Sequence, residues 1–471
     1  MVIGGGTAGL VTAAGTAGLG GRVALIERAR MGGECLNTGC VPSKALLSSA
    51  RLADQMRRAG TWGLTPRDPQ ADFGRVFERV RQRRAQIAPH DSVERFESLG
   101  VDVFRGAARF ASPHEVEVNG ERIRAKNFVI ATGSRPAVPS IDGLTRAKFY
   151  TNESIFDELA QRPRQMVVLG GGPIGCELSQ AFARLGVAVT LVELGPRLLP
   201  QEDADVSDLI RQRISEDGVR VLTGADARLV AEHGAVRRVW VEVEGQDREP
   251  IDCDAILVAV GRIANTDGLG LEQARVAFTA HGVTVDRALR TSQRHIYAAG
   301  DAVGPPHFTH LADRHARTIV RNIAAPWWPS RLDTSALPWC TFTSPEVARV
   351  GLNEQGAVRE GAAYDLFRMP MSGVDRAVVE SEEEGFAKVL LARGSDRILG
   401  ATIVSARAGE LIHEVALAMT AGLGLSTIAR TIHVYPTFSE ILRQIADARE
   451  RSRLTPFAKK VLTGIFRWAR R

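Results

Sequence analysis

The chain has 471 residues, of which 44% are hydrophobic and 24% charged, with a formal net charge of +6; this balance excludes disordered and fibrous classes. A chain of this length is expected to divide into about two to four domains. No run of roughly eighteen apolar residues predicts a membrane span, and Met1 leads into a strand pattern without a secretory signal, so we expect a cytoplasmic protein.

The N-terminus reads "MVIGGGTAGL", a short apolar strand followed by glycines at the GxGxxG spacing. Gly4, Gly6 and Gly9 allow the tight turn and the close backbone approach that a dinucleotide pyrophosphate requires. Glu27 ends the next apolar stretch, where its carboxylate can accept hydrogen bonds from a ribose. Because strands usually run about five or six residues, we expect the natural first strand to begin further upstream.

Two cysteines, Cys35 and Cys40, lie close together in "GGECLNTGCVPSK". In a reducing compartment such a pair is more often catalytic or metal-binding than structural. The intervening residues, Gly39 among them, allow the two Cα atoms to approach within the roughly 4.4–6.8 Å of a disulfide. A zinc site would need two further ligands at comparable spacing, and the sequence has no second close cysteine pair. The pattern therefore favours redox chemistry over a buried pair or a metal site.

A second glycine motif, "QMVVLGGGPIGCEL", repeats the first with Gly170, Gly172 and Gly175. Glu193 follows its last glycine at the same distance as Glu27 follows the first motif. Two matches with identical spacing to an acid predict two dinucleotide sites.

Two further apolar strands, in "NFVIATG" and "AILVAVG", end on Gly133 and Gly261. We interpret them as buried strands that meet the cofactors at their carboxyl ends, where open α/β sheets bind ligands.

Six segments occur in order along the chain: "GGGTAG", "GGECLNTGCVPSK", "ATGSRP", "GGGPIGCE", "AVGRIAN" and "TSQRHIYAAGD". Together they resemble the pyridine nucleotide-disulfide oxidoreductases, flavoenzymes that include dihydrolipoamide dehydrogenase, glutathione reductase and mercuric reductase. The resemblance extends from Met1 to about Ala446. It implies an α/β fold with two Rossmann-like dinucleotide-binding domains, FAD in the first and NAD in the second, plus a C-terminal α+β dimerisation domain. It also implies that Asp301 binds the ribityl chain of FAD.

The resemblance assigns roles within the cysteine box. In the family the second cysteine, here Cys40, lies against the flavin as a thiolate, and the first, Cys35, attacks the substrate. Hydride transfer and thiol–disulfide exchange each move two electrons, so a disulfide beside the flavin can relay them. Lys44 lies one helical turn after Cys40, where it can stabilise the thiolate, and its match in the family pairs with Glu177. The remaining cysteines are expected to be structural; they are Cys176, Cys253 and Cys340.

The second dinucleotide site is expected to prefer NAD. A carboxylate at Glu193 accepts the 2′-hydroxyl of NAD and repels the 2′-phosphate of NADP. Arg197, four residues further on, can soften this preference, so NADP(H) stays the alternative.

The resemblance also predicts the domain order. FAD-binding sequence occupies residues 1–150 and 265–333, an inserted NAD(P)-binding domain occupies 151–264, and a dimerisation domain occupies 334–450. In relatives this last domain carries a base that reaches the partner subunit's cysteine pair, so the resemblance implies a homodimer.

The chain departs from the disulfide reductases at this base. Their motif has a histidine directly before a proline and a glutamate five residues after it, whereas this chain reads "IHVYPTFSE", with Tyr435 before Pro436 and Glu440 in place. A phenol, whose pKa is about 10, cannot act as a base at neutral pH as an imidazole can. His433 is either a displaced base or a structural histidine, and we favour the structural role.

These motifs lead to one main hypothesis. The protein is interpreted as an FAD-dependent NAD(P)H oxidoreductase that passes electrons through Cys35 and Cys40 to a disulfide, a metal ion or another small oxidant. Tyr435 resembles the residue that mercuric reductase has at this position. That enzyme also uses a pair of cysteines at its C-terminus to pass the metal inward, whereas here no cysteine follows Cys340. Dihydrolipoamide dehydrogenase is the first alternative. A non-catalytic redox sensor or membrane-docked scaffold is the second, and no resident metal is predicted.

Residues 451–471 form a basic tail outside the resemblance. Thr455 and Pro456 predict a helix start, and apolar and basic residues gather on opposite sides at about 100° per residue. The tail holds seven basic and no acidic residues, so the other 450 residues carry 6 − 7 = −1. We expect it to bind an anionic membrane at the inner face or to pack on its own dimer. Nucleic acid is not an expected partner, because the basic charge is confined to the tail.

Overall fold

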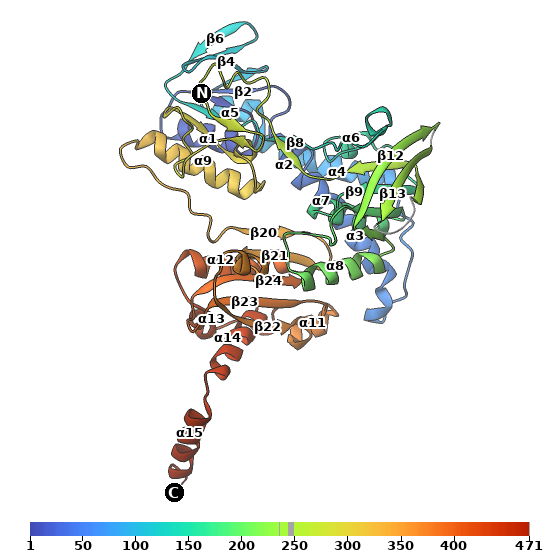
Figure 1. Cartoon of the computed structure of the whole chain (residues 1–471), viewed down its shortest axis with the longest axis vertical. Helices are drawn as coiled ribbons and strands as arrows, with labels where there is room; N and C mark the ends of the chain where they lie inside the picture. Colours follow the sequence, from blue (N-terminus) through green and yellow to red (C-terminus); the bar gives the residue numbers. More distant parts are fainter. Residues whose placement is uncertain (235, 244–248, 471) are drawn as a thin grey trace. The chain divides into compact units, whose positions relative to one another are not determined.

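The computed structural model of the chain describes residues 1–234, 236–243 and 249–470. It forms two compact units, shown in Figure 1. The first comprises Met1–Leu198 and Ile214–Asp333, and the second comprises Leu199–Arg213 and Thr334–Arg471. Each unit combines helices with β-sheets, so the predicted α/β character is confirmed.

A five-stranded parallel sheet in the order β19-β7-β1-β2-β3 organises the first half of the first unit. Its strands are β1 (Val2–Ile3), β2 (Val23–Glu27), β3 (Val101–Arg105), β7 (Phe128–Ile130) and β19 (Ile296–Ala298). Successive side chains point to opposite faces. Val2 joins a buried cluster with Leu10 of helix α1 (Thr7–Gly18), whereas Ile3 joins one with Phe110. Both faces are therefore covered, as a parallel sheet requires.

Helices and short strands complete this half. Helix α1 packs against α9 (Thr309–Ala324), as Figure 1 shows. The antiparallel strands are β4 (Arg109–Ser112), β5 (Glu115–Val118) and β6 (Glu121–Arg124), with the pairs β8 (Ser134–Pro136) and β16 (Arg262–Ala264), and β17 (Phe278–Thr279) and β18 (Gly282–Val283). Short 3-10 turns of the first unit occur at Ala59–Trp62, Ala88–Asp91, Leu144–Arg146 and Gly300–Val303, and one of the second unit at Met371–Gly373.

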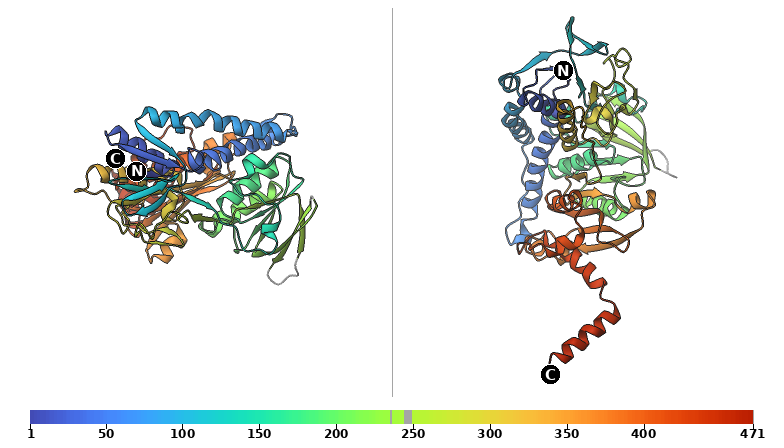
Figure 2. Two further views of the ribbon diagram at one scale, coloured as in Figure 1. Left: turned by 90° about the horizontal axis from the view of Figure 1, so that it is seen from above. Right: turned by 90° about the vertical axis from the view of Figure 1, so that its left-hand side faces the viewer.

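A long helix, α3 (Cys40–Arg57), begins at the second cysteine of the pair. It follows α2 (Gly33–Asn37) and runs beside α4 (Phe73–Ile87), and Figure 2 shows α3 and α4 side by side. It also packs against α7 (Pro173–Arg184). The short helices α5 (Val93–Ser98) and α6 (Ile155–Glu158) complete the set. The cysteine pair is thus placed between the two glycine-motif regions.

The second glycine motif belongs to a four-stranded parallel sheet in the order β11-β10-β9-β15. Its strands are β9 (Gln165–Leu169), β10 (Ala188–Glu193), β11 (Arg220–Thr223) and β15 (Ala255–Val258). An antiparallel sheet adds β12 (Ala225–His233), β13 (Val236–Val243) and β14 (Glu249–Cys253). The first unit therefore contains two Rossmann-like sheets, as the sequence predicted.

The second unit is built on a five-stranded antiparallel sheet in the order β20-β21-β24-β23-β22. Its strands are β20 (Pro338–Thr341), β21 (Glu346–Gly351), β22 (Tyr364–Pro370), β23 (Phe386–Ala392) and β24 (Ile398–Ser405). Its helices are α10 (Glu354–Arg359), α11 (Asp375–Glu380), α12 (Ala408–Thr420), α13 (Leu425–Arg430) and α14 (Glu440–Ser452). Helices α12 and α14 pack on the sheet over one apolar core. The predicted α+β character of this region is confirmed.

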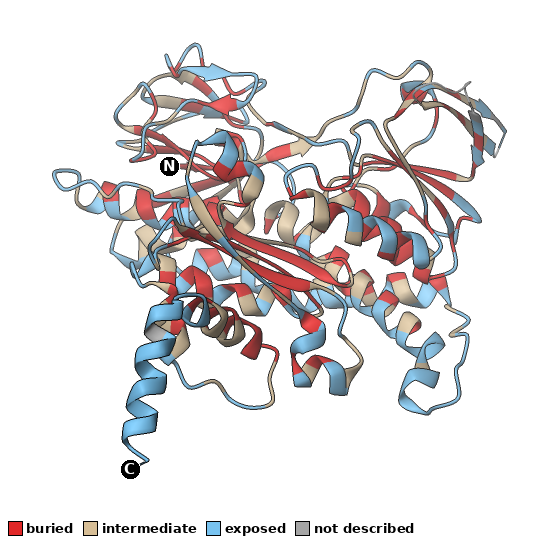
Figure 3. Cartoon of the chain, turned by 60° about the horizontal axis from the view of Figure 1, so that its bottom comes forward, coloured by how far each residue is buried: buried red, intermediate tan, exposed pale blue. Residues whose placement is uncertain are grey.

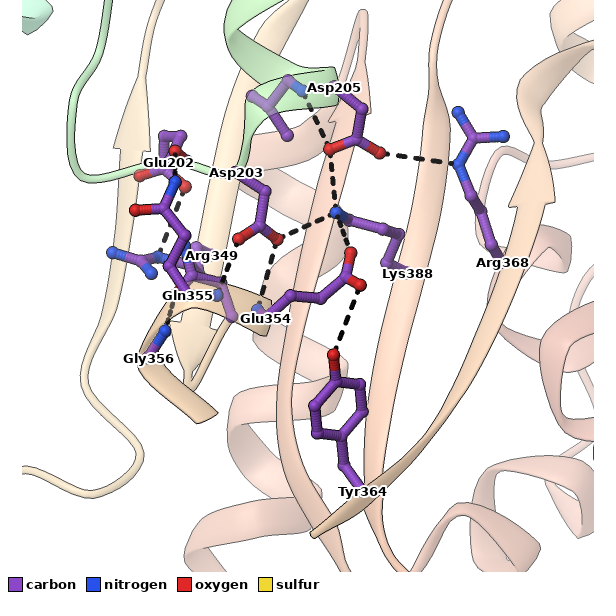
Figure 4. A network of polar contacts seen from close by, with 12 residues as sticks. Glu202, Asp203, Asp205, Arg349, Glu354, Gln355, Gly356, Tyr364, Arg368 and Lys388 are labelled. Atoms are coloured by element: carbon purple, nitrogen blue, oxygen red, sulfur yellow. Dashed lines mark hydrogen bonds and ion pairs between the residues drawn. The ribbon is translucent and has the colours of Figure 1, made fainter. Parts of the chain in front are cut away.

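Residues Leu199–Arg213 lie inside the expected nicotinamide domain of the sequence but belong to the second unit. They include the first part of helix α8 (Ala204–Glu216). Figure 4 shows the reason: the Lys388 ammonium bonds Asp203 at 2.8 Å, Asp205 at 2.9 Å and Glu354 at 2.8 Å. The Lys388 side chain is 1% exposed. A buried charge of this kind needs such partners, so the ion cluster keeps the segment in the second unit.

The C-terminal tail forms helix α15 (Pro456–Trp468), which begins where the sequence predicted. The expected boundary at residue 450 falls inside α14, which continues to Ser452. Figure 3 shows α15 exposed along its length, and every α15 residue whose burial is described is exposed. Among the described residues, no helix is long and apolar enough to cross a bilayer.

Candidate active site

The two cysteines of the box are free thiols on successive helices of the first unit. Cys35 lies within α2, and Cys40 is the first residue of α3, directly after Gly39. The first backbone N–H groups of a helix lack intrahelical partners and carry partial positive charge, which stabilises an anion there. The position of Cys40 therefore favours its thiolate.

The environments of the two thiols differ. A hydrogen bond with Cys40, followed by burial, raises the pKa of Cys35 well above its usual range. A hydrogen bond from Cys35 lowers the pKa of Cys40 to about 6, against burial, with help from Thr309 and the Lys44 charge. The Cys40 Sγ lies 3.3 Å from the Thr309 hydroxyl at the start of α9. At pH 7 the pair therefore carries its negative charge on Cys40.

Lys44 and Glu177 form an ion pair across helices α3 and α7. The Lys44 Nζ lies 2.7 Å from the Glu177 Oε2, and the Glu177 side chain is only 7% exposed. Lys44 stands one turn after Cys40 on the same helix, so its ammonium faces the thiolate side. The pairing that the resemblance implied is present in the structure.

The first glycine motif leaves a space that larger residues would fill. A Cβ at Gly4, whose φ is +111°, would lie 2.2 Å from the Ala131 carbonyl oxygen, and one at Gly9 would lie 1.8 Å from that of Gly4. Gly6 is more open, because its nearest neighbour would be the Gly33 Cα at 3.6 Å. Gly4 therefore makes a tight turn and Gly9 a close packing contact, whereas the backbone at Gly6 is open, as pyrophosphate binding requires.

The second glycine motif repeats this arrangement. A Cβ at Gly170 would meet the Ala259 carbonyl oxygen at 2.5 Å, and one at Gly175 would meet that of Gly170 at 1.8 Å. At Gly172 nothing lies within 4 Å. The backbone near both sites also turns on Gly133 and Gly261, which have φ values of +68° and +133°.

The two strand-end acids bind the backbone in the same way. Glu27 accepts hydrogen bonds from the N–H of Gly5 at 2.5 Å and Ala29 at 2.6 Å. Glu193 accepts them from Gly171 and Gly195, both at 2.6 Å. Each carboxylate is fixed beside its glycine turn and retains lone pairs for a ribose hydroxyl. The repeated geometry supports a dinucleotide at each motif.

A polar cluster surrounds Asp301, the residue expected to bind the flavin ribityl chain. The Asp301 Oδ2 accepts a hydrogen bond from Ser134 at 2.5 Å and lies 3.7 Å from the Arg262 Nε. Two buried atoms, Arg262 Nη1 and His307 Nε2, have no hydrogen-bond partner among the described residues. Buried donors of this kind need partners, and the hydroxyls and phosphates of FAD would supply them.

Sequence reasoning missed Glu34 and Arg262 as parts of this site. Arg262 forms an ion pair with Glu34, and Asn152 donates to the other Glu34 oxygen at 2.8 Å. Burial raises the pKa of Glu34 to about 7, against the Arg262 charge. The residues lie in the quoted segments "GGECLNTGC" and "AVGRIAN", so their positions were visible, but no spacing rule joins residues this far apart.

The candidate base residues lie in the second unit and do not share partners. Tyr435 is 67% exposed and donates its hydroxyl to Asp375 at 2.9 Å. His433 places Nε2 3.0 Å from a Glu414 carboxylate oxygen. Glu440 is buried. His433 and Tyr435 thus belong to two separate side-chain pairs.

Two dinucleotide cradles, with a cysteine pair whose second member is a stabilised thiolate, define a dinucleotide-dependent thiol–disulfide redox enzyme. The chain belongs to the pyridine nucleotide-disulphide oxidoreductase family, whose main domain matches residues 1–316. The dimerisation domain of the same family matches residues 337–446. The family uses FAD and NAD(P)H, so the expected cofactors are confirmed at that level.

Named relatives fall into two groups. The mercuric reductase of Staphylococcus aureus is 34% identical over 447 residues, covering 95% of this chain and 81% of the relative. The dihydrolipoyl dehydrogenase of Thermus scotoductus is 36% identical over 463 residues, covering 95% of this chain and 96% of the relative. Both groups contain FAD-dependent oxidoreductases, which confirms the predicted class of enzyme.

Solved structures show the same fold. The HOCl-induced flavoprotein disulfide reductase RclA from Escherichia coli has a TM-score of 0.84 and 30% identity, covering 95% of this chain and 98% of its own. LpdA from Mycobacterium tuberculosis has a TM-score of 0.85 and 28% identity, covering 95% and 98%. The predicted fold class, with its C-terminal dimerisation domain, is confirmed.

Proposed function

We propose that the protein passes electrons from NADH through FAD and the Cys35–Cys40 pair to a small oxidant. The observation that supports it most is the lowered pKa of Cys40, about 6, caused first by the Cys35 hydrogen bond, at the start of a helix whose Lys44 pairs with Glu177. Bound FAD supplies two-electron transfer between the nicotinamide and a disulfide.

The chain's own residues then have separate tasks. The first glycine motif and Glu27 hold the first dinucleotide, and the second glycine motif and Glu193 hold the second. Two electrons and one proton, the equivalent of the hydride of NADH, convert the Cys35–Cys40 disulfide into the Cys35 thiol and the Cys40 thiolate. Cys35 faces the oxidant and gives up the electron pair, which re-forms the disulfide. Lys44 stabilises the negative charge on Cys40 while the pair is reduced.

Two cysteine variants test this assignment. Reduced wild-type protein should show a long-wavelength charge-transfer band from the Cys40 thiolate to FAD. Cys40→Ser should abolish the band, whereas Cys35→Ser should show it without added reductant. If both variants keep wild-type disulfide-linked turnover, the assignment is wrong.

The oxidant is a disulfide, a metal ion or another small molecule of that kind. The relatives named mercuric reductase and the exposed Tyr435 favour a mercuric reductase-like acceptor over lipoamide. The second candidate is dihydrolipoamide dehydrogenase, favoured by relatives of that name. An NADH-oxidation screen against lipoamide, glutathione disulfide, mercuric and cupric ions, and quinones separates these candidates.

We further propose a homodimer in which residues 433–440 face the partner subunit's cysteine pair. The matching dimerisation domain supports a dimer, and the 67% exposure of Tyr435 leaves it available to a second chain. Sedimentation of the full chain should therefore give a dimer, and a monomer with full turnover would contradict this arrangement.

The tail is proposed to attach a cytoplasmic enzyme to the inner face of an anionic membrane. Helix α15 carries Phe457, Ile465 and Trp468 as exposed apolar residues, with basic residues such as Lys459 and Lys460 in the same segment. An amphipathic basic helix of this kind lies in a lipid interface, where each basic residue is worth roughly 1 kcal/mol.

Liposome sedimentation tests this attachment. The protein should bind anionic but not neutral vesicles, and salt should weaken binding. Truncation after Arg453 removes α15 and leaves α14 intact, so it should abolish binding and spare NADH oxidation. Replacing Lys459 and Lys460 with glutamine should weaken binding more than the same change at two surface lysines elsewhere. Equal binding to both vesicle types would contradict the proposal.

A further inference from the structure

Three side chains around residue 435, those of His433, Tyr435 and Glu440, each form a polar pair with another residue of this chain. The Tyr435 hydroxyl donates to the Asp375 Oδ2 at 2.9 Å. Asp375 is the first residue of α11, and Tyr435 follows α13, so the pair joins parts of the chain that are 60 positions apart. The phenol is therefore held by a carboxylate that no sequence motif pointed to.

His433 and Glu440 already have hydrogen-bond partners other than Tyr435. Both ring nitrogens of His433 are bonded, Nδ1 to the Thr431 carbonyl at 3.0 Å and Nε2 to Glu414 at 3.0 Å, and its side chain is 5% exposed. Glu440 bonds Arg443 at 2.9 Å, and its side chain is 8% exposed. In the described part of the chain, neither group hydrogen-bonds the side chain at position 435.

The Tyr435 hydroxyl is held in its neutral form. A hydrogen bond to Asp375, then the Asp375 charge, burial and the Glu440 charge raise the pKa of Tyr435 above its usual value. A phenol in this state donates a hydrogen bond and does not accept a proton near pH 7. These residues therefore present a hydrogen-bonded phenol and no free base among these groups.

We propose that Asp375, and not Glu440, is the positioning carboxylate for the residue at 435, and that it holds Tyr435 as a neutral phenol. This rests on the proposed function only in placing position 435 opposite the partner subunit's Cys35. The substrate class follows: oxidants that take electrons from Cys35 without a base suit this position, whereas dithiol donors, which must lose a proton before they attack the disulfide, do not.

Tyrosine titration tests the positioning role without any turnover. The chain has 4 tyrosines, so the absorbance difference between wild type and Y435F at each pH isolates the ionisation of Tyr435. D375N should lower that pKa, because it removes a charge next to the phenol. E440Q is the matched carboxylate-to-amide variant and should move it less. The result that overturns the proposal is a larger shift with E440Q than with D375N.

A second measurement uses an introduced base. Y435H should raise dihydrolipoamide oxidation, in which the imidazole accepts the proton of the attacking dithiol, because general base catalysis contributes about 10²–10⁴-fold. The double variant Y435H/D375N should lose most of that gain and move the acid limb of the pH profile to lower pH. Y435H/E440Q should keep the gain and leave the acid limb where Y435H has it. Equal loss in the two double variants contradicts the role of Asp375. If Y435H gives no gain, the proposed placement of position 435 fails, and the titration still decides the role of Asp375.

Discussion

At the scale of single residues, the chemistry is concentrated on one helix turn. Cys40 at the start of α3 and Lys44 one turn later combine a helix N-terminus, a hydrogen bond and a nearby cation. Each of these favours a thiolate, and together they lower the pKa of Cys40 to about 6 despite burial. The charge-transfer band of reduced enzyme should therefore persist at pH 7 and fade as the pH falls through about 6.

Lys44→Met should raise the pKa of Cys40, because it removes the cation that lowers it. We expect a shift of about one unit, which moves the fading of the charge-transfer band to higher pH. A pH titration of the reduced protein at the band measures this shift. Arg51→Met, which lies further along α3, serves as the control and should leave the curve in place.

Glu193→Ala should narrow the preference for NADH over NADPH. The carboxylate accepts hydrogen bonds from Gly171 and Gly195, so it is held where it would repel a 2′-phosphate. Loss of this repulsion should reduce the ratio of kcat/KM values about tenfold, equivalent to roughly 1.4 kcal/mol. Arg197→Ala is the companion variant and should move the ratio the other way. A wild-type preference for NADPH would contradict the role of Glu193.

At the scale of elements, helices α3 and α7 position the site, and the segment Leu199–Arg213 joins the second unit. Helix α3 carries Cys40 and Lys44, and α7 brings Glu177 to them from the second glycine motif. Helix α8 begins in the second unit, held there by the Lys388 cluster. The oxygens of Asp203, Asp205 and Glu354 lie within 4.8 Å of one another, so the ammonium between them offsets their mutual repulsion.

Lys388→Met should destabilise the second unit strongly, because it leaves three clustered carboxylates without their cation. Breaking a buried pair on one side costs about 3–5 kcal/mol. Arg368→Met is the matched control, since Arg368 is 46% exposed at the side chain and lies 3.7 Å from Asp205, where an ion pair is worth about 0–1 kcal/mol. Thermal unfolding of the two variants should show a much lower midpoint only for Lys388→Met. Equal midpoints would mean that the cluster adds no stability.

At the scale of the whole molecule, the family domains account for all but residues 317–336 and 447–471, and the tail stands apart from them. Residues 1–316 and 337–446 match the family, whereas α15 lies beyond both and is exposed. The tail also holds more positive charge than the whole protein does in net terms. The net positive charge of the chain therefore lies in the tail, outside the two family domains.

Deletion of α15 after Arg453 should leave the stability of the protein unchanged. The exposed helix contributes little buried area, and surface changes usually stay within about 0.5 kcal/mol. The thermal midpoint should shift by less than about 2 °C, and sedimentation should still give a dimer. A lower midpoint or loss of the dimer would show instead that α15 packs against a second chain.

Local spacing explains why much of this protein could be predicted from sequence. The glycine turns, the strand-end acids Glu27 and Glu193, and the start of α15 at Pro456 depend on residues close together in the chain, and the structure has them where expected. The fold class followed from the order of such motifs. Backbone conformation and helix capping act over a few residues, so a sequence pattern is sufficient to specify them.

Only the tertiary structure decided which distant groups meet. Tyr435 bonds Asp375 across 60 positions, and Lys388 bonds Asp203 across 185. Thr309 reaches Cys40 across 269. No periodicity joins residues so far apart, because their contact depends on strand order, helix packing and the closure of long loops. The sequence by itself therefore determined the cofactor motifs, the cysteine pair and Lys44 beside it, and the fold decided that Thr309 also contacts the thiolate and which carboxylate holds Tyr435.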